Sequence, residues 1–444
     1  MLYALGVVLA FVGIALSIAL HEIGHLVPAK KFGLRVPQYM VGFGPTIWSR
    51  TRGETEYGVK AIPLGGYIRM IGMFPPAPGQ DPMTARVSNT GRMGQLIDEA
   101  RQQSLEEVRP GDEGRMFFQL PVWKRVIIML GGPVMNLLIA LVLFTGVFTL
   151  HGIPVATPTI SSVNECVDIS RAGQQAADKC TPDMPIAPAN EAGLRPGDTI
   201  TAINGAPVTT WTDVREAIRD NLGAPLTMAV TRDGESVTLQ ADPIVLDLPV
   251  YDEHGQMLKD ASGEPVTERA GFLGASGSRE MQQQELSAVP GLFWEQVGQT
   301  YGLLVKIPQK LVGVAEAAFG SAERDPNGPM SVVGVGRIAG EVASSDAFGD
   351  TLDKAVLLIS LLASLNLVLF AFNTIPLLPL DGGHIAGALW EALKKGWARL
   401  RGLPDPGPVD VAKALPLAYG VALAFIAMTV LLVYADIFKP IRLS

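Results

Sequence analysis

The chain has 444 residues, of which 48% are hydrophobic and 18% are charged, and its mean hydropathy is +0.28. This hydropathy and the long runs without charge exclude an ordinary soluble protein and indicate a membrane protein with several spans. The formal net charge is −8. Because the sequence also has no basic patch with interleaved aromatic residues, nucleic acid is not expected as a partner.

The first predicted span, residues 1–29, contains the sequence His21-Glu22-Ile23-Gly24-His25. Positions i and i+4 share one face of a helix, so His21 and His25 can bind a single Zn²⁺ while Glu22 acts as general base. The alternative is a chance pattern, but ionisable residues inside a span are costly and usually functional. No basic residue precedes the stretch, so we expect a retained span rather than a signal peptide.

Residues 30–73 are predicted to form a membrane-associated β-hairpin or sheet on the cytoplasmic side. Here β-branched and aromatic residues are interrupted by glycines, among them Gly65 and Gly66. A sheet edge at this place could pair with an extended substrate; the alternative is a structural hairpin that caps the helices. Prolines and polar residues then dominate residues 74–121, which are predicted to be a cytoplasmic loop with at most one short helix.

The second predicted span covers residues 122–150, and a separate α/β domain is expected at residues 155–247. Its pattern predicts a helix at 211–219 and strands at 226–230 and 237–241. The segment 190–200 resembles the core of a bacterial PDZ domain, which implies peptide binding by strand addition at Ala192, Gly193 and Leu194. Exclusion of bulky substrates is the alternative role. Cys166 and Cys180 either form a disulfide or remain free.

Residues 248–351 are expected to be a linker with an amphipathic helix at 290–319, which would lie on the outer membrane surface or pack against the PDZ domain. The third predicted span, residues 352–382, carries Asn373 and ends at Asp381. A catalytic zinc site needs a third protein ligand, which Asp381 can supply. His384 is a rival ligand, and a turn or helix cap is the other reading of Asp381. A cytoplasmic loop at 383–413 and a fourth span at 414–436 complete the chain.

Positive charge near the span ends predicts the orientation of the chain. Lys and Arg concentrate after the first span, before the second, and between the third and fourth, so these loops should be cytoplasmic. The segment from 152 to 351 holds 13 Lys and Arg against 27 Asp and Glu. We therefore expect an extracytoplasmic acidic domain, both termini outside, and the His-Glu-His motif and Asp381 near the cytoplasmic face.

Several motifs together resemble the site-2 protease family of intramembrane zinc metalloproteases, in particular its bacterial members with a single PDZ domain, as found in actinobacteria. The motifs are H-E-x-x-H, the N-x-x-P-x-x-P-L-D-G sequence that contains Asn373 and Asp381, Pro63-Leu64-Gly65-Gly66-Tyr67, and Gly131-Gly132-Pro133-Val134-Met135-Asn136. The family resemblance implies one Zn²⁺ per chain, with His21, His25 and Asp381 as ligands and Glu22 as the acid/base residue.

The same resemblance implies that Asn373, Asn136, Gly65 and Gly66 bind the substrate. For Asn136 the competing reading is close helix packing through its neighbouring glycines, and for Asn373 it is a hydrogen bond within the helix bundle. The family implies a bacterial inner membrane protein that cuts single-span proteins such as anti-sigma factors, or remnant signal peptides, after an upstream site-1-type protease has trimmed them. A non-enzymatic PDZ scaffold and a metal transporter are the alternatives from other classes; a transporter would need ionisable groups along a path rather than in one cluster.

Overall fold

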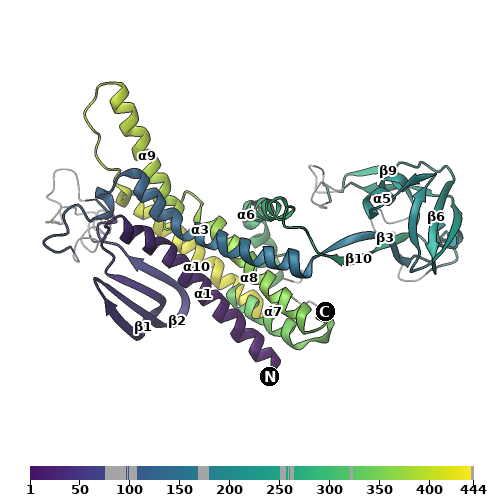
Figure 1. Cartoon of the computed structure of the whole chain (residues 1–444), viewed down its shortest axis with the longest axis horizontal. Coiled ribbons are helices and arrows are strands. Elements are labelled where there is room, and N and C mark those ends of the chain that lie inside the picture. Colours follow the sequence, from purple (N-terminus) through teal and green to yellow (C-terminus); the bar gives the residue numbers. More distant parts are fainter. Residues whose placement is uncertain are drawn as a thin grey trace. The chain divides into compact units, whose positions relative to one another are not determined.

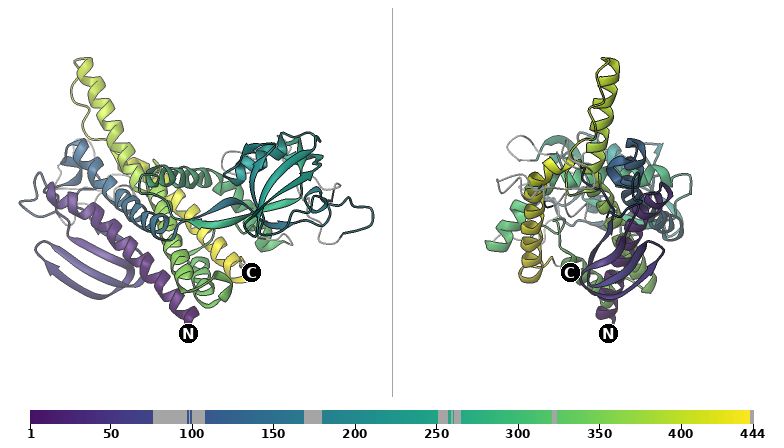
Figure 2. Two further views of the ribbon diagram at one scale, coloured as in Figure 1. Left: turned by 45° about the vertical axis from the view of Figure 1, so that its right-hand side comes forward. Right: turned by 90° about the vertical axis from the view of Figure 1, so that its left-hand side faces the viewer.

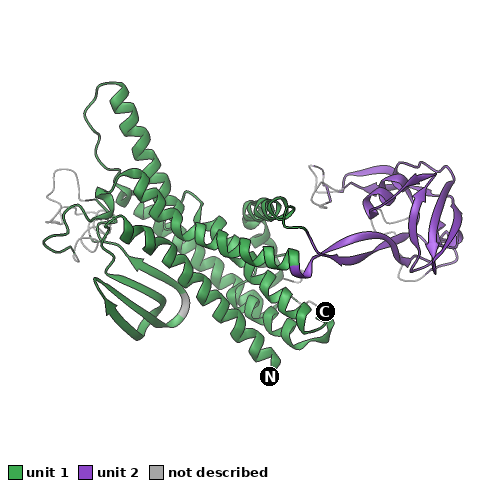
Figure 3. Ribbon diagram, viewed as in Figure 1, with its two compact units in different colours: residues 1–149, 285–444 green, residues 150–284 purple. Residues whose placement is uncertain are grey.

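The computed structural model describes residues 1–75, 97, 99, 108–168, 180–250, 257–258, 260, 265–320 and 324–441. Most of the predicted loop 74–121 therefore lies outside the described residues. The chain divides into two compact units, drawn in different colours in Figure 3: unit 1 comprises Met1–Thr149 and Glu285–Ser444, and unit 2 comprises Leu150–Gln284.

Four helices among the described residues are long and apolar enough to cross a membrane. They are α1 (Leu2–Lys31), α3 (Val122–Gly146), which continues as the π-helical turn Val147–His151, α8 (Thr351–Asn373) and α10 (Leu415–Phe438). The prediction of a multi-pass helical membrane protein is thus confirmed. The start of α8 is fixed by Asp350, whose side chain accepts hydrogen bonds from the backbone N–H groups of Leu352 and Asp353.

Helices α1 and α3 cross at glycines, which lets their backbones touch. A Cβ atom on Gly24 would collide with the carbonyl oxygen of Gly131, and a Cβ on Gly131 would collide with that of Gly24. Small residues at such crossings allow close packing where lipid provides no hydrophobic drive for association. The crossing brings the middle of α3 against the His-Glu-His segment of α1.

Unit 1 also contains the helices α6 (Val289–Phe319), α7 (Val332–Ser344) and α9 (Asp381–Leu400). Helix α6 packs on α10 through Val314 and Ala318. Helix α9 extends beyond the other helices of unit 1 (Figure 2) and occupies much of the segment 383–413, which had been predicted as a loop. The lysines and arginines of that segment had suggested a loop, but its apolar residues recur at helical spacing. Short 3₁₀ turns are found at Phe117–Gln119, Asp346–Phe348 and Val411–Ala414.

The strands β1 (Gln38–Arg52) and β2 (Thr55–Arg69) form a long hairpin that lies beside α1 (Figure 1). The register is more complex than that of a simple hairpin, because the first part of β1 has partners on both sides. Tyr39 lies opposite Tyr57, in the first half of β2, and also opposite Ile68, in the second half. The second half of β2 is therefore an outer strand of this small sheet.

Unit 2 is built on a sheet with the strand order β10-β3-β4-β6-β7, to which β5 adds on β4; β8 and β9 form a separate pair. Its core contains Ile200, Leu226, Met228 and Val230. Cys166 and Cys180 form a disulfide. The elements are β3 (Ile153–Val163), α4 (Pro188–Glu191), β4 (Thr199–Ile203), β5 (Ala206–Pro207), α5 (Trp211–Arg219), β6 (Leu226–Arg232), β7 (Glu235–Ala241), β8 (Ile244–Pro249), β9 (Thr267–Phe272) and β10 (Ala275–Gln282).

The boundary of unit 2 differs from the predicted limits of 155–247. The compact unit runs to Gln284, because β10 pairs with β3 along most of its length, from Ala275 opposite Val163 to Gln282 opposite Ile153. The expected linker 248–351 thus contributes strands to unit 2 and helices α6 and α7 to unit 1. Local sequence patterns do not reveal a strand pair whose members lie more than a hundred residues apart.

Candidate metal centre and its cavity

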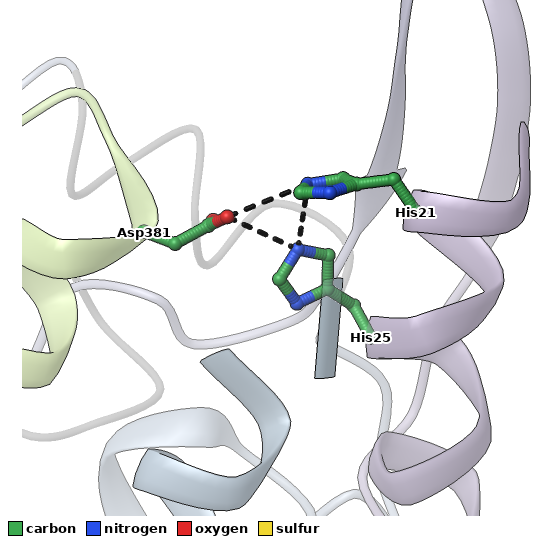
Figure 4. Close-up of side chains that lie close together, drawn as sticks. All are labelled: His21, His25 and Asp381. Atoms are coloured by element: carbon green, nitrogen blue, oxygen red, sulfur yellow. Dashed lines mark hydrogen bonds and ion pairs between the residues drawn. The ribbon is translucent and has the colours of Figure 1, made fainter. Parts of the chain in front are cut away.

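Three side chains from distant parts of the sequence meet at one point in unit 1 (Figure 4). His21 and His25 project from α1, and Asp381 is the first residue of α9. The Nε2 atoms of the two histidines are 3.2 Å apart, and Oδ2 of Asp381 lies 3.4 Å from Nε2 of His21 and 3.3 Å from Nε2 of His25. The i, i+4 spacing on α1 and the turn after α8 together produce this cluster.

The protonation of His25 can be inferred from its other ring nitrogen. Nδ1 of His25 lies 2.7 Å from the carbonyl oxygen of Ile128, and a carbonyl can only accept, so Nδ1 carries a hydrogen. In the neutral ring, Nε2 then presents a lone pair toward His21 and Asp381. A backbone carbonyl that orients a histidine in this way is common around metal ligands.

The cluster fits a zinc ion by its spacing. With bonds of about 2.0–2.1 Å to zinc, two ligand atoms of a tetrahedral site lie about 3.3 Å apart, and the three distances of 3.2, 3.3 and 3.4 Å match this value. Oδ2 of Asp381 and Nδ1 of His21 are buried and have no hydrogen-bond partner among the described residues. Two imidazoles and a carboxylate are a known ligand set for catalytic zinc.

Gly132 of α3 provides the space for this cluster. A Cβ atom at Gly132 would collide with Nε2 of His25 and would lie only 2.7 Å from Nε2 of His21. The sequence interpretation did not assign this glycine to the site. The pairing of Gly24 inside the H-E-x-x-H motif with Gly131-Gly132 in another span is the signal that could have suggested it.

Glu22 lies beside the cluster, against strand β2. A Cβ on Gly66 would be 3.1 Å from Cγ of Glu22, and Ile68 of the same strand lines the cavity together with Glu22. Strand β2 therefore comes within contact distance of the candidate base. A glycine at position 66 allows the backbone to approach this closely.

A cavity of about 470 Å³ surrounds the cluster. Besides His21, Glu22, His25 and Asp381, its walls include all four residues predicted to bind substrate, from three different elements: Gly65 and Gly66 of β2, Asn136 of α3 and Asn373 of α8. This volume lies in the usual range of ligand pockets, about 300–1,000 Å³. His384, the rival ligand, also lines the cavity but does not belong to the three-residue cluster.

The two asparagines differ in their hydrogen bonding. Asn136 is fully buried, and neither its amide nitrogen nor its oxygen has a hydrogen-bond partner among the described residues. Leaving such a group unpaired costs about 1–3 kcal/mol. Asn373 donates to the carbonyl oxygen of Leu369, one turn earlier in α8, at 3.0 Å, and its Oδ1 can still accept a hydrogen bond.

Ala192, Gly193 and Leu194 lie in unit 2, and none of them lines the cavity described in that unit. Leu194 is buried in the core, and the carbonyl oxygen of Gly193 accepts a hydrogen bond from Arg232 at 2.7 Å. Arg232 also pairs with Asp198 and holds the pKa of that carboxyl below its usual range. The contacts of Arg232 stabilise the turn before β4. The predicted peptide binding at these three residues stays a prediction.

A buried ion pair, which the sequence interpretation did not identify, ties α9 to α3. Nη2 of Arg125 donates to Oε1 of Glu391 at 2.6 Å, and both side chains are at least 95% buried. Glu391 also receives hydrogen bonds from Lys395 and from the backbone N–H of Val409. Burial alone would raise the pKa of Glu391, but these partners hold it below the usual value. The pair fixes the helix that begins with Asp381 to the helix that carries Gly132.

The chain is similar to known zinc metalloproteases. The sequence profile of Peptidase family M50 matches residues 9–401. The chain is 34% identical over 454 residues to "Zinc metalloprotease Rip1" of Mycobacterium tuberculosis and 32% identical over 456 residues to the protein of that name in Mycolicibacterium smegmatis, and each match covers 100% of both chains. It is 28% identical to "Metalloprotease MmpA" of Caulobacter vibrioides over 391 residues, or 86% of this chain and 85% of that protein.

These matches confirm the predicted enzyme class, a metalloendopeptidase with a zinc cofactor, and agree with the four apolar helices of a multi-pass membrane protein. The profile spans the H-E-x-x-H motif of α1, all of unit 2, and Asp381 at the start of α9. The chain therefore belongs to Peptidase family M50, the site-2 protease family of zinc metalloproteases that act in the membrane.

Proposed function

We propose that His21, His25 and Asp381 hold one Zn²⁺ per chain and that Glu22 is the general acid and base of peptide hydrolysis. The observation that carries the proposal is the triangle of ligand atoms with edges of 3.2–3.4 Å, with Glu22 lining the same cavity. Membership of a zinc peptidase family favours this function over a PDZ scaffold or a metal transporter.

When bound, zinc supplies Lewis-acid chemistry that acidifies water and polarises the scissile carbonyl. The carboxylate of Glu22 accepts the proton of the attacking water and then returns it to the leaving amine. Nδ1 of His25, held by the Ile128 carbonyl, keeps Nε2 free to act as a ligand. Because Gly132 has no side chain, both imidazoles can occupy these positions.

The outer strand of the small sheet is proposed to hold the substrate in an extended form. Residues of β1 cover one edge of the second half of β2, as in the pairs Val41–Gly66 and Tyr39–Ile68, and no described strand pairs with the other edge. Gly65, Gly66 and Ile68 also line the cavity. Addition of a substrate strand at this edge would keep its backbone hydrogen-bonded while a scissile bond faces Glu22.

Asn136 and Asn373, which line the same cavity, are proposed to bind the substrate backbone. A backbone N–H and a backbone C=O would satisfy the two unpaired atoms of the Asn136 amide. Asn373 can accept a backbone N–H through Oδ1. Such contacts do not depend on substrate side chains, which suits an enzyme that cleaves apolar spans of varied sequence.

The distribution of charge supports an orientation with the site near the cytoplasmic face and unit 2 outside. Within that orientation, unit 2 is proposed to be a PDZ-like domain that excludes bulky ectodomains. The proposed substrates are single-span membrane proteins, anti-sigma factors and remnant signal peptides among them, after an upstream protease has removed most of the outer domain. A disulfide in unit 2 is consistent with an oxidising compartment.

The test combines metal analysis with cleavage. The purified protein in detergent should contain one zinc per chain and cut a single-span reporter, whereas Glu22→Gln should retain zinc but lose cleavage, and Asp381→Asn should lose both. Asp346→Asn is the matched control, because Asp346 is fully exposed and far from the cluster in sequence. Cleavage by Glu22→Gln would refute the mechanism, and full zinc content in Asp381→Asn would refute the ligand assignment.

A further inference from the structure

A second cavity lies along α1 and α8, two helices that also line the metal cavity. It has a volume of about 260 Å³ and lies between α1 and α8, with α7 as its third wall; its lining includes Leu9, Gly13, Ile14, Val335, Leu362 and Leu365. Every lining residue is apolar or glycine. We name this cavity the α1–α8 groove. Leu9 and Ile359 of its lining are 52% and 40% exposed, so the groove opens to the surface that the bilayer covers.

The α1–α8 groove continues into the metal cavity on both helices. Ile14 is the last groove residue on α1, and Ile18 is the first cavity residue; on α8 the corresponding pair is Leu365 and Leu369. Each step is four residues, about 6 Å along a helix. The same faces of α1 and α8 therefore line first an apolar groove and then, one turn further, the polar cavity with the metal cluster.

A buried hydrogen bond lies within this single turn. The amide nitrogen of Asn366 donates to Oγ of Ser17 at 2.9 Å, and the two residues are 0% and 2% exposed. Asn366 also donates to the carbonyl oxygen of Leu362 at 2.8 Å. This bond joins α1 to α8 between the groove and the cavity, and the groove itself offers no polar side chain.

The change from apolar to polar lining limits the conformation of a bound span. Unpaired backbone groups cost several kcal/mol each in an apolar environment, so a chain in the groove must keep its helical hydrogen bonds. In the metal cavity, the strand edge of β2 and the amides of Asn136 and Asn373 can pair with an unwound backbone. The helix can therefore end only after it has left the groove.

We propose that the α1–α8 groove binds the part of a substrate span that remains helical, and that the turn marked by Ser17 and Asn366 is where the span unwinds. This inference rests on the proposed protease function. The groove is not large enough for a whole helix: two turns of a helix 10 Å wide occupy on the order of 800 Å³, so 260 Å³ takes one face. Small residues such as Gly13 let that face pack closely and displace lipid chains.

The geometry also sets the distance between the end of the helix and the cleavage site. From Ile14 to His21 is seven residues of α1, about 10 Å. An extended chain advances about 3.3 Å per residue. The scissile bond is thus expected about three residues beyond the last residue held in the groove.

Filling the groove tests the proposal. A Cβ at Gly13 would lie 3.2 Å from the side chain of Leu362, so Gly13→Leu should occlude the groove without touching the metal cluster. Gly420→Leu is the matched control, because a Cβ there meets nothing within 4 Å. Two probes are compared in lipid nanodiscs: a single-span reporter of leucine and alanine, and a short soluble peptide with the same cleavage sequence.

Gly13→Leu should lower kcat/KM at least tenfold for the reporter and less than twofold for the peptide, and Gly420→Leu should change neither. If Gly13→Leu cleaves the reporter like the wild type, or slows both probes equally, the groove binds lipid or has only a structural role and the inference is wrong. Glu22→Gln separates this result from the proposed function, because residual cleavage by that variant refutes the protease mechanism whatever Gly13→Leu does.

Disulfide crosslinking locates the span directly. The two native cysteines are bonded to each other, so Ala10→Cys in the Glu22→Gln background introduces the only free thiol. This thiol should crosslink to reporter cysteines that are placed at helical spacing in the part of the span that remains helical. Val12→Cys, at a 58% exposed position outside the groove lining, should not. Equal crosslinking at both positions would overturn the inference.

Discussion

Substitution of Gly132 by alanine provides a sharp test of the metal centre, because it adds one methyl group on a helix that supplies no ligand. The added Cβ would lie 2.7 Å from Nε2 of His21, where ordinary contact begins at 3.4 Å, and it would collide with Nε2 of His25. Both imidazoles must therefore move, that of His21 by about 0.7 Å and that of His25 by more. A shift of about 0.7 Å is a fifth of the spacing that tetrahedral zinc requires.

The expected loss follows from this displacement. A misplacement of about 1 Å at a catalytic group can cost about 100-fold in rate, and changes around metal ligands typically cost about 10–100-fold in metal affinity. Gly132→Ala should therefore lower kcat/KM for a single-span reporter by about 100-fold and weaken zinc binding measured by competition with a chelator. The thermal unfolding midpoint reports whether the protein remains folded.

Gly146→Ala, at the end of the same helix, is the matched control. A Cβ at Gly146 meets nothing within 4 Å, and alanine is a better helix former than glycine. This variant should keep wild-type activity and zinc. If Gly132→Ala also keeps one zinc per chain and activity within threefold of the wild type, the two histidines do not hold a metal in the observed arrangement.

Three further outcomes are expected. Glu22→Gln should lower kcat by about 10²–10⁴-fold without loss of zinc, measured with the same reporter and metal assay. Glu391→Gln should destabilise the protein by about 3–5 kcal/mol, seen as a lower unfolding midpoint, because it breaks a buried pair and leaves Arg125 underpaired; Arg125→Met in addition should restore part of the loss. Arg232 lowers the pKa of Asp198 in the folded protein. The pair therefore stabilises unit 2 fully at pH values above the pKa of Asp198 in the unfolded chain, about 3.9. This stabilisation is lost as the pH falls through the lower pKa of the folded state. After correction for the intrinsic pH dependence of exchange, the protection of backbone amides in unit 2 should be lower at pH 3 than at pH 6, and Asp198→Asn should reduce the difference.

Features with a local physical cause could be predicted from the sequence. The four spans follow from the length of the apolar runs, and α5 occupies the residues where a helix was predicted. Asp381 was preferred to His384 as the third ligand because a carboxylate completes a common zinc set. The structure brings Asp381, and not His384, into the cluster with His21 and His25.

Features that depend on contacts between distant residues could not be predicted. The pair Arg125–Glu391 joins residues 266 positions apart, and no local pattern connects them. The outer edge of β2 exists because the first half of β1 pairs on both sides, which the pattern of strand residues does not reveal. The extent of unit 2 depends on the pairing of β10 with β3 for the same reason.

Helix α3 has the central part in positioning the candidate site, although it provides no ligand. It contacts α1, which bears the two histidines, through Gly24 and Gly131. Through Arg125 it holds α9, which begins with Asp381. The separation of the ligand atoms therefore depends on two contacts of α3, one with α1 and one with α9. A change at either contact should impair metal binding as surely as a change beside a ligand, since a carboxylate and two imidazoles bind one ion only while their helices are held at the right distance.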